Sequence, residues 1–325
     1  MLRAVVTGGA GFIGSYVVED LIRRGFHVRV IDNLSSGRYE YIREFIERGY
    51  VEFYNIDLKN FNENVSHVFK DVDVVYHLAA NPEVRISISE PRLHFNENIL
   101  VTFNVLEACR LNKVKLVVFT SSSTVYGDAK IIPTPENYTP LEPISVYGAS
   151  KLASENLIIT YSKVYGIKGL ILRLANIVGA RQTHGVIVDF IKKLRMDSSK
   201  LEILGDGKQK KSYLHISDFL TALNVAVDFL MSSNSSYEVF NVGNDDWIEV
   251  DDIASEVING LGLRNVNIHH LTTTPDGRGW VGDVKFMLLD ISKISKLGWR
   301  PKLSSRAAIR LTVNELLRLS TFKYL

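Results

Sequence analysis

Short apolar runs alternate with longer amphipathic stretches through the first half of the chain. The runs at 4–7, 27–31 and 72–77 are continuous rather than alternating, which is typical of parallel strands buried on both faces. Between the first two runs, residues 12–24 follow a helical pattern that ends in a cationic turn and Gly25, a common end for a helix. Further strands are expected at 51–55, 115–120 and 169–174, and long helices at 91–111 and 146–164. The pattern predicts an α/β fold with a doubly wound parallel sheet.

The regular alternation weakens after residue 176. Short helices and strands mix there with glycine and proline turns, at 205–207, 275–277 and 298–301. A helix at 219–229 and a strand at 239–242 fit a return to the main sheet. We therefore expect residues 1–175 to form the first domain, with 212–245 returning to it, and residues 176–325 to form a smaller α+β lobe interleaved with it.

A glycine cluster separates the first predicted strand from the first predicted helix. Gly8 suits a tight turn, Gly11 lets a pyrophosphate approach the backbone, and Gly14 lets helix and strand pack closely. The helix N-terminus then offers free N–H groups to phosphate. Asp32 ends the second predicted strand, where a carboxylate binds the ribose hydroxyls and repels a 2′-phosphate. This context predicts a dinucleotide site that prefers NAD to NADP; the alternative is an ordinary glycine turn with a solvated aspartate.

Tyr147 and Lys151 lie four residues apart in the helical stretch 146–164. This spacing places them on one helix face, where an ammonium stabilises a phenolate and makes the tyrosine a plausible general base. The pair alone is weak, because tyrosine and lysine often lie four apart on a helix surface. Five consecutive hydroxyl residues, 120–124, follow a predicted strand, at the sheet edge where α/β folds bind ligands; the alternative there is a polar turn.

Composition and charge exclude several classes of protein. Among 325 residues the formal net charge is +2, too weak for a nucleic-acid partner. No apolar stretch is long enough to span a membrane, and nothing in the pattern calls for a metal. The single cysteine, Cys109, cannot form an internal disulfide and falls in an apolar helical pattern, so we expect it in the core of a protein of a reducing compartment, the cytoplasm.

These motifs together resemble the extended short-chain dehydrogenase/reductases. The resemblance rests on the glycine pattern, Asp32, the hydroxyl run ending in Val-Tyr-Gly at 125–127, and the Tyr147-x-x-x-Lys151 pair. It also rests on Asp57–Leu58, on His-Leu-Ala-Ala at 77–80, on 173–179 and on 205–207. It covers the chain to about Pro301. Within the family the chain is most similar to the UDP-glucose 4-epimerases of archaea and bacteria, which implies a Rossmann domain that binds NAD and a lobe that binds a UDP-sugar.

The resemblance implies a role for each matching residue. Tyr147 would be the catalytic base, Lys151 would hold the nicotinamide ribose, and Ser122 would bind the sugar 4-oxygen. Besides the three glycines, Asp32, Tyr147 and Lys151, the residues implied to contact NAD are Phe12, Ile13, Asn33, Ser35, Ser36, Gly37, Asp57, Leu58, Leu78, Ala79, Ala80, Asn98 and Ser121. Besides Ser122 and Tyr147, those implied to contact the substrate are Ser123, Thr124, Asn176, Lys211, Arg278 and Met287.

The chain departs from the family pattern where the diphosphate would bind. Lys211 stands where the family often has arginine, which keeps the charge and loses the guanidinium fork. Trp280 replaces a second arginine, and Arg278, two residues earlier, is the candidate substitute. Met287 stands where the resemblance implies a gate beside the sugar 2-substituent; the alternative is a core methionine in an apolar run.

Rival activities are weighed on the same residues. The related 4,6-dehydratases need an Asp-Glu pair at the positions of Ser123 and Thr124, and the related decarboxylases need a Glu at the position of Thr124. Neither Ser123 nor Thr124 supplies a carboxylic acid, which disfavours both activities. Another nucleotide-sugar epimerase, acting on UDP-N-acetylglucosamine or UDP-glucuronate, stays open. So do a nucleotide-sugar reductase and a non-catalytic NAD-sensing protein, although the latter typically lack the tyrosine or lysine. The hexose and the base are not fixed by the sequence.

The two long predicted helices suggest an assembly. Leu152, Leu157, Ile158, Ile159 and Tyr161 point in several directions around helix 146–164, more than one sheet face can cover. Related enzymes pair this helix and helix 91–111 across a two-fold axis, so we expect a homodimer. The alternative is that the smaller lobe covers the spare face.

Overall fold

The computed structural model describes residues 2–319, which group into two compact units. The first unit comprises the chain to Val125 together with Ser145–Arg173 and Leu223–Phe240. The second comprises Tyr126–Ile144, Leu174–Ala222 and the chain from Asn241 onward. The assignment of NAD to the first region and of the nucleotide sugar to the second stays a prediction.

Seven strands of the described chain form the sheet of the first unit, in the order β11-β6-β5-β4-β1-β2-β3. The pairs β1–β2, β2–β3, β1–β4 and β4–β5 are parallel, which confirms the predicted doubly wound sheet. The strand order reverses between β1 and β4, and such a switch point creates a crevice at the carboxyl ends of the strands. The strands are β1 (Arg3–Thr7), β2 (His27–Asp32), β3 (Val51–Asn55), β4 (Val74–His77), β5 (Leu116–Ser122), β6 (Lys168–Leu174) and β11 (Tyr237–Val242).

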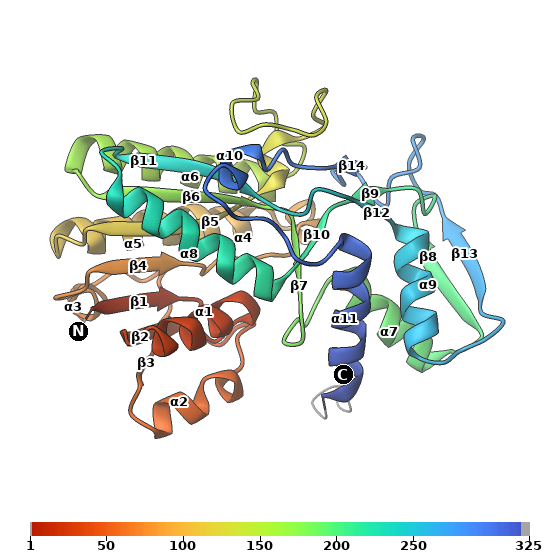
Figure 1. Ribbon diagram of the computed structural model, residues 1–325, viewed down its shortest axis with the longest axis horizontal. Coiled ribbons are helices and arrows are strands. Elements are labelled where there is room, and N and C mark those ends of the chain that lie inside the picture. The colour runs from red at the N-terminus through yellow and green to blue at the C-terminus, as the bar shows by residue number, and fades with distance from the viewer. Residues whose placement is uncertain (1, 320–325) are drawn as a thin grey trace. The chain divides into compact units, whose positions relative to one another are not determined.

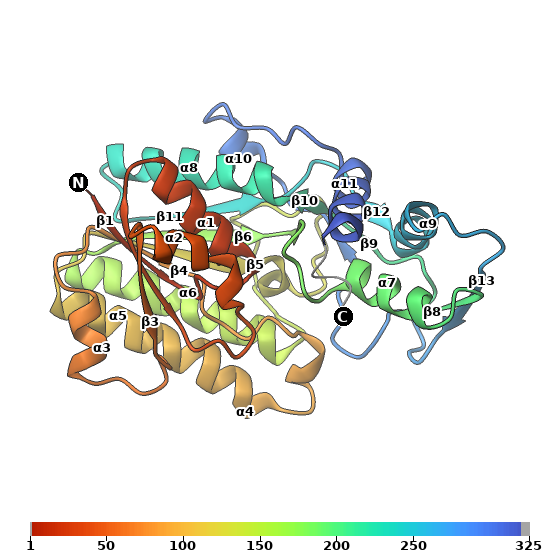
Figure 2. The ribbon, with the colours of Figure 1, turned by 90° about the horizontal axis from the view of Figure 1, so that it is seen from below.

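Helices cover both faces of this sheet (Figures 1 and 2). One face carries α1 (Phe12–Arg23) and the end of α8 (Ile216–Ser232), joined where Asn224 Nδ2 donates to Asp20 Oδ2 over 3.0 Å. The other carries α3 (Glu63–Val68), α4 (Pro91–His94), α5 (Val101–Leu111) and α6 (Val146–Tyr165). The short α2 (Arg43–Glu47) lies on the side of α1, beside β3. Cys109 is buried here against apolar residues of the sheet, as predicted. Three-residue 3₁₀ turns occur at Tyr39–Tyr41 and Arg85–Ser87, and a four-residue turn follows β5 at Ser123–Tyr126.

The predicted single helix at 91–111 is three segments. Between α4 and α5 the backbone forms a π-helical stretch, Phe95–Leu100. Such a turn widens the backbone spacing by one residue and is frequent at functional sites. It places the buried side chain of Asn98 toward α6, where it bonds to Ser150.

The second unit has a core to which α7, α9, α11 and several short strands contribute, with residues such as Phe190, Ile203, Ile253 and Ile309 fully or almost fully buried. The helices are α7 (Val186–Met196), α9 (Val250–Gly260), α10 (Ser292–Ser295) and α11 (Ser305–Arg318). The strands are β7 (Asn176–Val178), β8 (Lys200–Leu204), β9 (Lys210–Lys211), β10 (Tyr213–His215), β12 (Ile248–Glu249), β13 (Asn267–Leu271) and β14 (Phe286–Met287). Within residues 2–319 these strands form three small sheets, β10–β7, β12–β9–β14 and β13–β8.

Residues 2–319 show neither a membrane-spanning helix nor a metal-binding cluster. No helix in this part of the chain combines the length and the apolar character needed to cross a bilayer. The same residues contain no group of three or more His, Cys, Asp or Glu side chains placed to hold a metal ion.

Candidate active site

The glycine turn after β1 brings three backbone segments into contact. Gly8 has a φ of +70°, and a Cβ there would lie 2.8 Å from the backbone nitrogen of Ala79, after β4. A Cβ on Gly14 would lie 2.0 Å from the carbonyl oxygen of Gly8. A Cβ on Gly11 would meet that oxygen at 3.2 Å, which is tight but not prohibitive. Gly8 and Gly14 therefore permit the close packing of turn, helix and β4, whereas Gly11 only borders the turn.

The start of α1 fits a phosphate. Gly11 is the N-cap residue, and no side chain caps this end of the helix. The first helical residues, Phe12 and Ile13, therefore present N–H groups with no helical partner at the positive end of the helix dipole. Together with the open glycine turn, this is the geometry that a dinucleotide pyrophosphate requires.

Asp32 lies at the end of β2 with only 8% of its surface exposed. Its carboxylate accepts hydrogen bonds from Ala10 N at 3.0 Å and Leu34 N at 2.8 Å. Burial raises the pKa of this carboxyl, while the two backbone hydrogen bonds oppose the rise. A Cβ on Gly37 would lie 2.7 Å from Asp32 Oδ1, so the loop 33–37 folds tightly around the carboxylate. Asn33 closes the start of this loop by accepting from Ser35 N at 3.0 Å, and Ser36 is exposed.

The residues predicted beside the adenine follow β3. Asp57 Oδ1 accepts from Lys59 N at 3.0 Å, and the Lys59 ammonium lies 3.4 Å from Asp57 and 3.5 Å from Glu97. Leu58 is buried, and its carbonyl oxygen accepts from Asn104 Nδ2 of α5. These bonds fix the loop after β3 against the face of the sheet covered by α5.

A buried histidine links β1, β4 and α5 on the side predicted for the nicotinamide. His77 Nδ1 lies 2.8 Å from Thr7 Oγ1, and its Nε2 lies 3.0 Å from Thr102 Oγ1. Burial lowers the pKa of His77 to about 3, and the nearby Lys151 adds to that, so the imidazole is neutral. Ala79 N donates to Thr7 Oγ1 over 3.3 Å, which ties the predicted nicotinamide loop, 78–80, to this row of hydrogen bonds.

Asn98 connects the π-helical turn to the predicted catalytic helix. Its Oδ1 accepts from Asn81 N at 2.8 Å, and its Nδ2 donates to Ser150 Oγ at 2.8 Å. Ser150 Oγ in turn donates to the carbonyl oxygen of Tyr147 over 2.7 Å. The buried His94 packs edge-to-face on the ring of Tyr147, with centroids 5.8 Å apart. Asn98 therefore positions the backbone and ring of Tyr147 from behind.

Ser122 lies at the end of β5, and its Oγ accepts from Thr124 Oγ1 at 2.9 Å and from Thr124 N at 3.2 Å. Its own proton is therefore left for another acceptor. Burial raises the pKa of Tyr147 to about 12, and the Ser122 hydroxyl opposes the rise. Thr124 therefore orients Ser122, and Ser122 stabilises the phenolate.

Lys151 is 4% exposed and lies one helical turn after Tyr147. Its Nζ donates to Thr120 O over 2.9 Å and lies 5.9 Å from the centroid of the Tyr147 ring. Burial lowers its pKa to about 8, and the charge of Glu155 opposes the fall. Ser121 and Ser123 are also buried, and Ser121 donates to Glu155.

The second unit gathers the residues predicted at the diphosphate. Lys211 Nζ lies 2.5 Å from the carboxylate of the buried Asp283 and 5.7 Å from the Trp280 ring centroid. Asn176 Nδ2 donates to the carbonyl oxygen of Ser212, the residue after Lys211. Met287 is 8% exposed and pairs with Lys211 in the register of β14 and β9. Side chains at paired positions share one face of a sheet.

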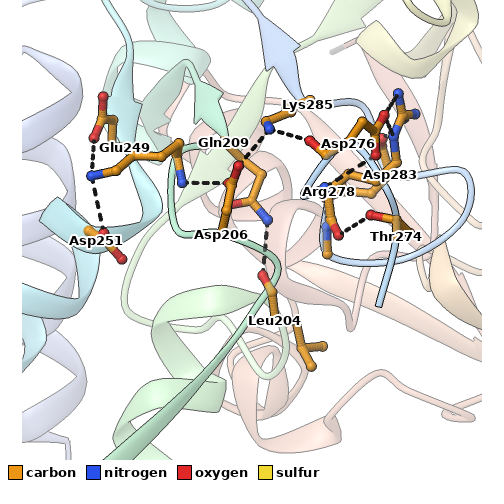
Figure 3. A network of polar contacts seen from close by, with 12 residues as sticks. Leu204, Asp206, Gln209, Glu249, Asp251, Thr274, Asp276, Arg278, Asp283 and Lys285 are labelled. Carbon is orange, nitrogen blue, oxygen red and sulfur yellow. Dashed lines mark hydrogen bonds and ion pairs between the residues drawn. The ribbon is translucent and has the colours of Figure 1, made fainter. Parts of the chain in front are cut away.

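Arg278 belongs to a polar network in the loop before β14 (Figure 3). Its guanidinium contacts the carboxylates of Asp276 at 2.6 Å and Asp128 at 3.1 Å, and donates to the carbonyl oxygen of Asp283 over 3.0 Å. Nearby, Lys285 pairs with Asp206 at 2.7 Å. Asp283 thus joins Arg278 and Lys211. The predicted diphosphate contacts of both cations stay predictions, because each cation is held by carboxylates here.

The sequence predicts no function for two residues near the predicted site, His77 and Arg173. Both lie inside motifs of the family resemblance, but the resemblance implies no contact with cofactor or substrate for either. Glu155, four residues after Lys151, binds Arg173 through Nε at 3.0 Å and Nη2 at 2.8 Å. The Lys151–Glu155 spacing was visible in the sequence, but the partner on β6 was not.

The chain is similar in sequence to a family of known enzymes. Residues 4–243 match the model of the NAD dependent epimerase/dehydratase family. A Methanocaldococcus jannaschii protein, provisionally named a UDP-glucose 4-epimerase, is 35% identical over 315 residues, 95% of this chain and 97% of that one.

Two solved structures are similar over almost their whole length. A UDP-galactose 4-epimerase is 46% identical, with a TM-score of 0.87 over 98% of this chain and 99% of that one. A UDP-N-acetylglucosamine 4-epimerase from Methanobrevibacter ruminantium is 30% identical, with a TM-score of 0.84 over 97% of this chain and 98% of that one.

The glycine turn yields a contrast between two substitutions. We expect Gly14→Ala to lower the melting temperature in the absence of NAD, because its Cβ would overlap the Gly8 carbonyl. Gly11→Ala should keep the melting temperature within a few degrees of the parent value. It should weaken NAD binding at least as strongly as Gly14→Ala does, since its Cβ borders the predicted phosphate position. Differential scanning fluorimetry with and without NAD measures both effects. Equal losses of stability for the two variants would contradict the distinction.

Proposed function

This chain belongs to the NAD-dependent epimerase/dehydratase family, and we propose that it is a UDP-glucose 4-epimerase, which interconverts UDP-glucose and UDP-galactose. The observation that carries the proposal is the arrangement beside the end of β5, where Tyr147 and Lys151 lie one turn apart on α6 and Lys151 Nζ donates to Thr120 O. NAD is the cofactor of the family, and the glycine turn, the free start of α1 and Asp32 fit it.

The bound cofactor supplies a hydride acceptor and donor for C4 of the sugar. Tyr147 takes the proton of the 4-hydroxyl as the hydride leaves C4, and it returns a proton when the hydride comes back to the opposite face of C4. Ser122 donates a hydrogen bond to the phenolate and, like Tyr147, contacts the 4-oxygen of the sugar. Lys151, kept as an ammonium, stabilises the phenolate through its charge and binds the nicotinamide ribose. Asn98 and His94 limit the movement of Tyr147, so the base stays oriented through both half-reactions.

An epimerase needs no further acid, and this favours it over its sister activities. Ser123 and Thr124, where related dehydratases carry a carboxylate pair, present only hydroxyls. The carboxylate of Glu155 is bound by Arg173 and Ser121. A dehydration would require a proton donor for the leaving hydroxyl, and the residues that follow Ser122 do not supply a carboxylic acid.

The decisive experiment offers the protein several sugars with no added reductant. UDP-glucose, UDP-N-acetylglucosamine and UDP-glucuronate are incubated separately, and their 4-epimers are measured by chromatography. We expect UDP-galactose as the main product. Conversion of either other sugar at a higher kcat/KM would replace UDP-glucose as the substrate, and absence of every epimer would refute the 4-epimerase. NAD that stays bound through gel filtration distinguishes an epimerase from a reductase with an exchanging cofactor.

Replacing the proposed base tests the chemistry. Tyr147→Phe should keep the fold and NAD binding and lower kcat by roughly two to four orders of magnitude, the usual range for a general acid–base group. Tyr161→Phe is the matched control, because Tyr161 lies on the same helix and its hydroxyl donates to Glu107. Near-normal turnover in the Tyr147 variant would remove Tyr147 from the mechanism.

We propose that Met287 gates the sugar 2-substituent. Its register with Lys211 places it beside the cation predicted at the diphosphate, and an unbranched methionine moves aside at modest cost. UDP-N-acetylated sugars should therefore react weakly. Met287→Tyr should lower the ratio of N-acetylated to plain activity, and Met287→Ser should raise it. Equal losses on both sugar pairs with a lower melting temperature would show that Met287 only packs.

We propose that the chain forms a homodimer through α5 and α6. Phe95 and Phe103 are 56% and 43% exposed and lie two turns apart along the π-helical stretch and α5, which pack against α6. Light scattering at micromolar concentration should give twice the mass of one chain, and Phe103→Glu should halve it. Phe61→Glu, at an exposed phenylalanine outside these helices, should not. A monomeric parent protein would contradict the proposed dimer.

The cytoplasmic location of the protein stays a prediction.

A further inference from the structure

Three ionisable side chains are buried together in the first unit, and one of them is the predicted catalytic residue Lys151. Lys151 and Glu155 lie one turn apart on α6, and Arg173 lies on β6 beside them. Their exposed fractions are 4%, 1% and 5%. Such burial of charged groups is costly unless each is paired and hydrogen-bonded, so the arrangement of the partners is informative.

Glu155 is saturated with donors. Arg173 reaches its two oxygens through Nε at 3.0 and 3.2 Å and through Nη2 at 2.8 Å, and Ser121 donates from the end of β5. A carboxylate bound in this way is fixed as an anion in one position. Lys151, by contrast, donates to the carbonyl oxygen of Thr120 and lies 4.8 Å from the ring centroid of Phe119. The ammonium therefore has a neutral hydrogen-bond partner and depends on charge at a distance.

The groups facing Lys151 leave Glu155 as its nearby anion. From α6 these groups are Tyr147 and Glu155, from β4 His77, from α4 His94, and from β6 Arg173 beyond Glu155. His77 is neutral because burial lowers its pKa to about 3. Burial also lowers the pKa of His94. Burial lowers the pKa of Lys151 to about 8 even though the charge of Glu155 opposes the fall, which leaves the ammonium little margin above neutral pH.

Stability alone gives a weak account of this ion pair. The cost of desolvating two charges often cancels their attraction, so a buried pair adds little net stability compared with apolar side chains of the same size. Its position four residues after Lys151, with Ser121 of the hydroxyl run as a third partner, connects it to the reacting groups instead.

We propose that Glu155 and Arg173 are positioning residues that together set the charge of Lys151. Glu155 supplies the negative charge that keeps Lys151 an ammonium, and Arg173 offsets part of that charge. The proposal rests on the proposed function, in which Lys151 must be charged to hold the ribose and stabilise the Tyr147 phenolate. It predicts that removing the two partners singly moves the protonation of Lys151 in opposite directions, which a merely structural pair would not do.

The test measures Lys151 directly and needs no sugar. The NAD-saturated protein is prepared with lysine labelled with ¹³C at the ε-carbon, and the Lys151 signal, identified by its loss in Lys151→Met, is titrated by NMR. In Glu155→Gln the midpoint should fall by roughly one pH unit, the scale expected for loss of a close opposite charge. In Arg173→Gln it should rise, because Glu155 is then unopposed. If the chain epimerises, the alkaline limb of its pH–rate profile should move in the same two directions.

Glu107→Gln is the matched control. Glu107 on α5 is also held by an arginine fork, from Arg110, and by a hydroxyl, from Tyr161. Its loss therefore removes the same kinds of hydrogen bond, at a more exposed site, without removing the charge near Lys151. We expect the Lys151 midpoint to stay unchanged in this variant.

A double variant keeps the proposal testable if a single variant does not fold. Glu155→Gln with Arg173→Gln removes both charges of the ion pair together, and its Lys151 midpoint should lie below that of the parent and above that of Glu155→Gln. The proposal is overturned if the two single variants shift the midpoint in the same direction, or if neither they nor the double variant shifts it more than Glu107→Gln does. Failure to epimerise any sugar would count against the proposed function and leave this titration interpretable.

Discussion

The close approach of three backbone segments at the ends of β1 and β4 is the constraint on which the first unit depends. Gly14 packs on the Gly8 carbonyl and Gly8 packs on Ala79, at distances that leave no room for a Cβ. Because the turn is so compact, α1 begins directly at the crevice of the sheet with its first N–H groups free. The same contact fixes the loop after β4, which Thr7 and His77 secure from below by hydrogen bonds. The positions of the predicted cofactor-binding groups on two strands are thus set by backbone packing together with these hydrogen bonds.

Hydrogen bonds, rather than backbone packing, hold the proposed catalytic groups in place. The π-helical turn directs Asn98 toward α6, where Ser150 passes the restraint to the backbone of Tyr147. On the other side Thr124 orients Ser122, and beneath them Glu155 and Arg173 lie behind Lys151. Each reacting side chain therefore has a second residue that fixes its rotamer or its charge. In the proposed mechanism, such support lets the phenol act as acid and base beside a fixed ammonium, without mobile partners.

Short-range patterns in the sequence predicted more than long-range ones could. The glycine turn, Asp32 and the Tyr147–Lys151 pair depend on neighbours within a turn or a strand, and their geometry follows from local spacing. Asn98 could be placed only through the family resemblance, because its π-helical turn leaves no mark in the hydrophobic pattern. Lys211 is bonded to Asp283, 72 residues away, and β9, β12 and β14 contain two residues each, too few for any periodicity. The partner of Glu155 is likewise on a different element, so no spacing rule could name it.

The interleaving of the two units has a consequence for synthesis of the chain. Neither unit is a continuous segment, and the chain passes from one to the other five times, between residues 125 and 126 and again at 144, 173, 222 and 240. The strand β6 is almost wholly buried, and its neighbour β11 begins only at Tyr237. A nascent chain that has folded as far as β6 must therefore carry an open apolar strand edge until the ribosome has added the residues of β11. Such an edge is a template for pairing with other chains, so the chain is exposed to aggregation in the interval between these two strands.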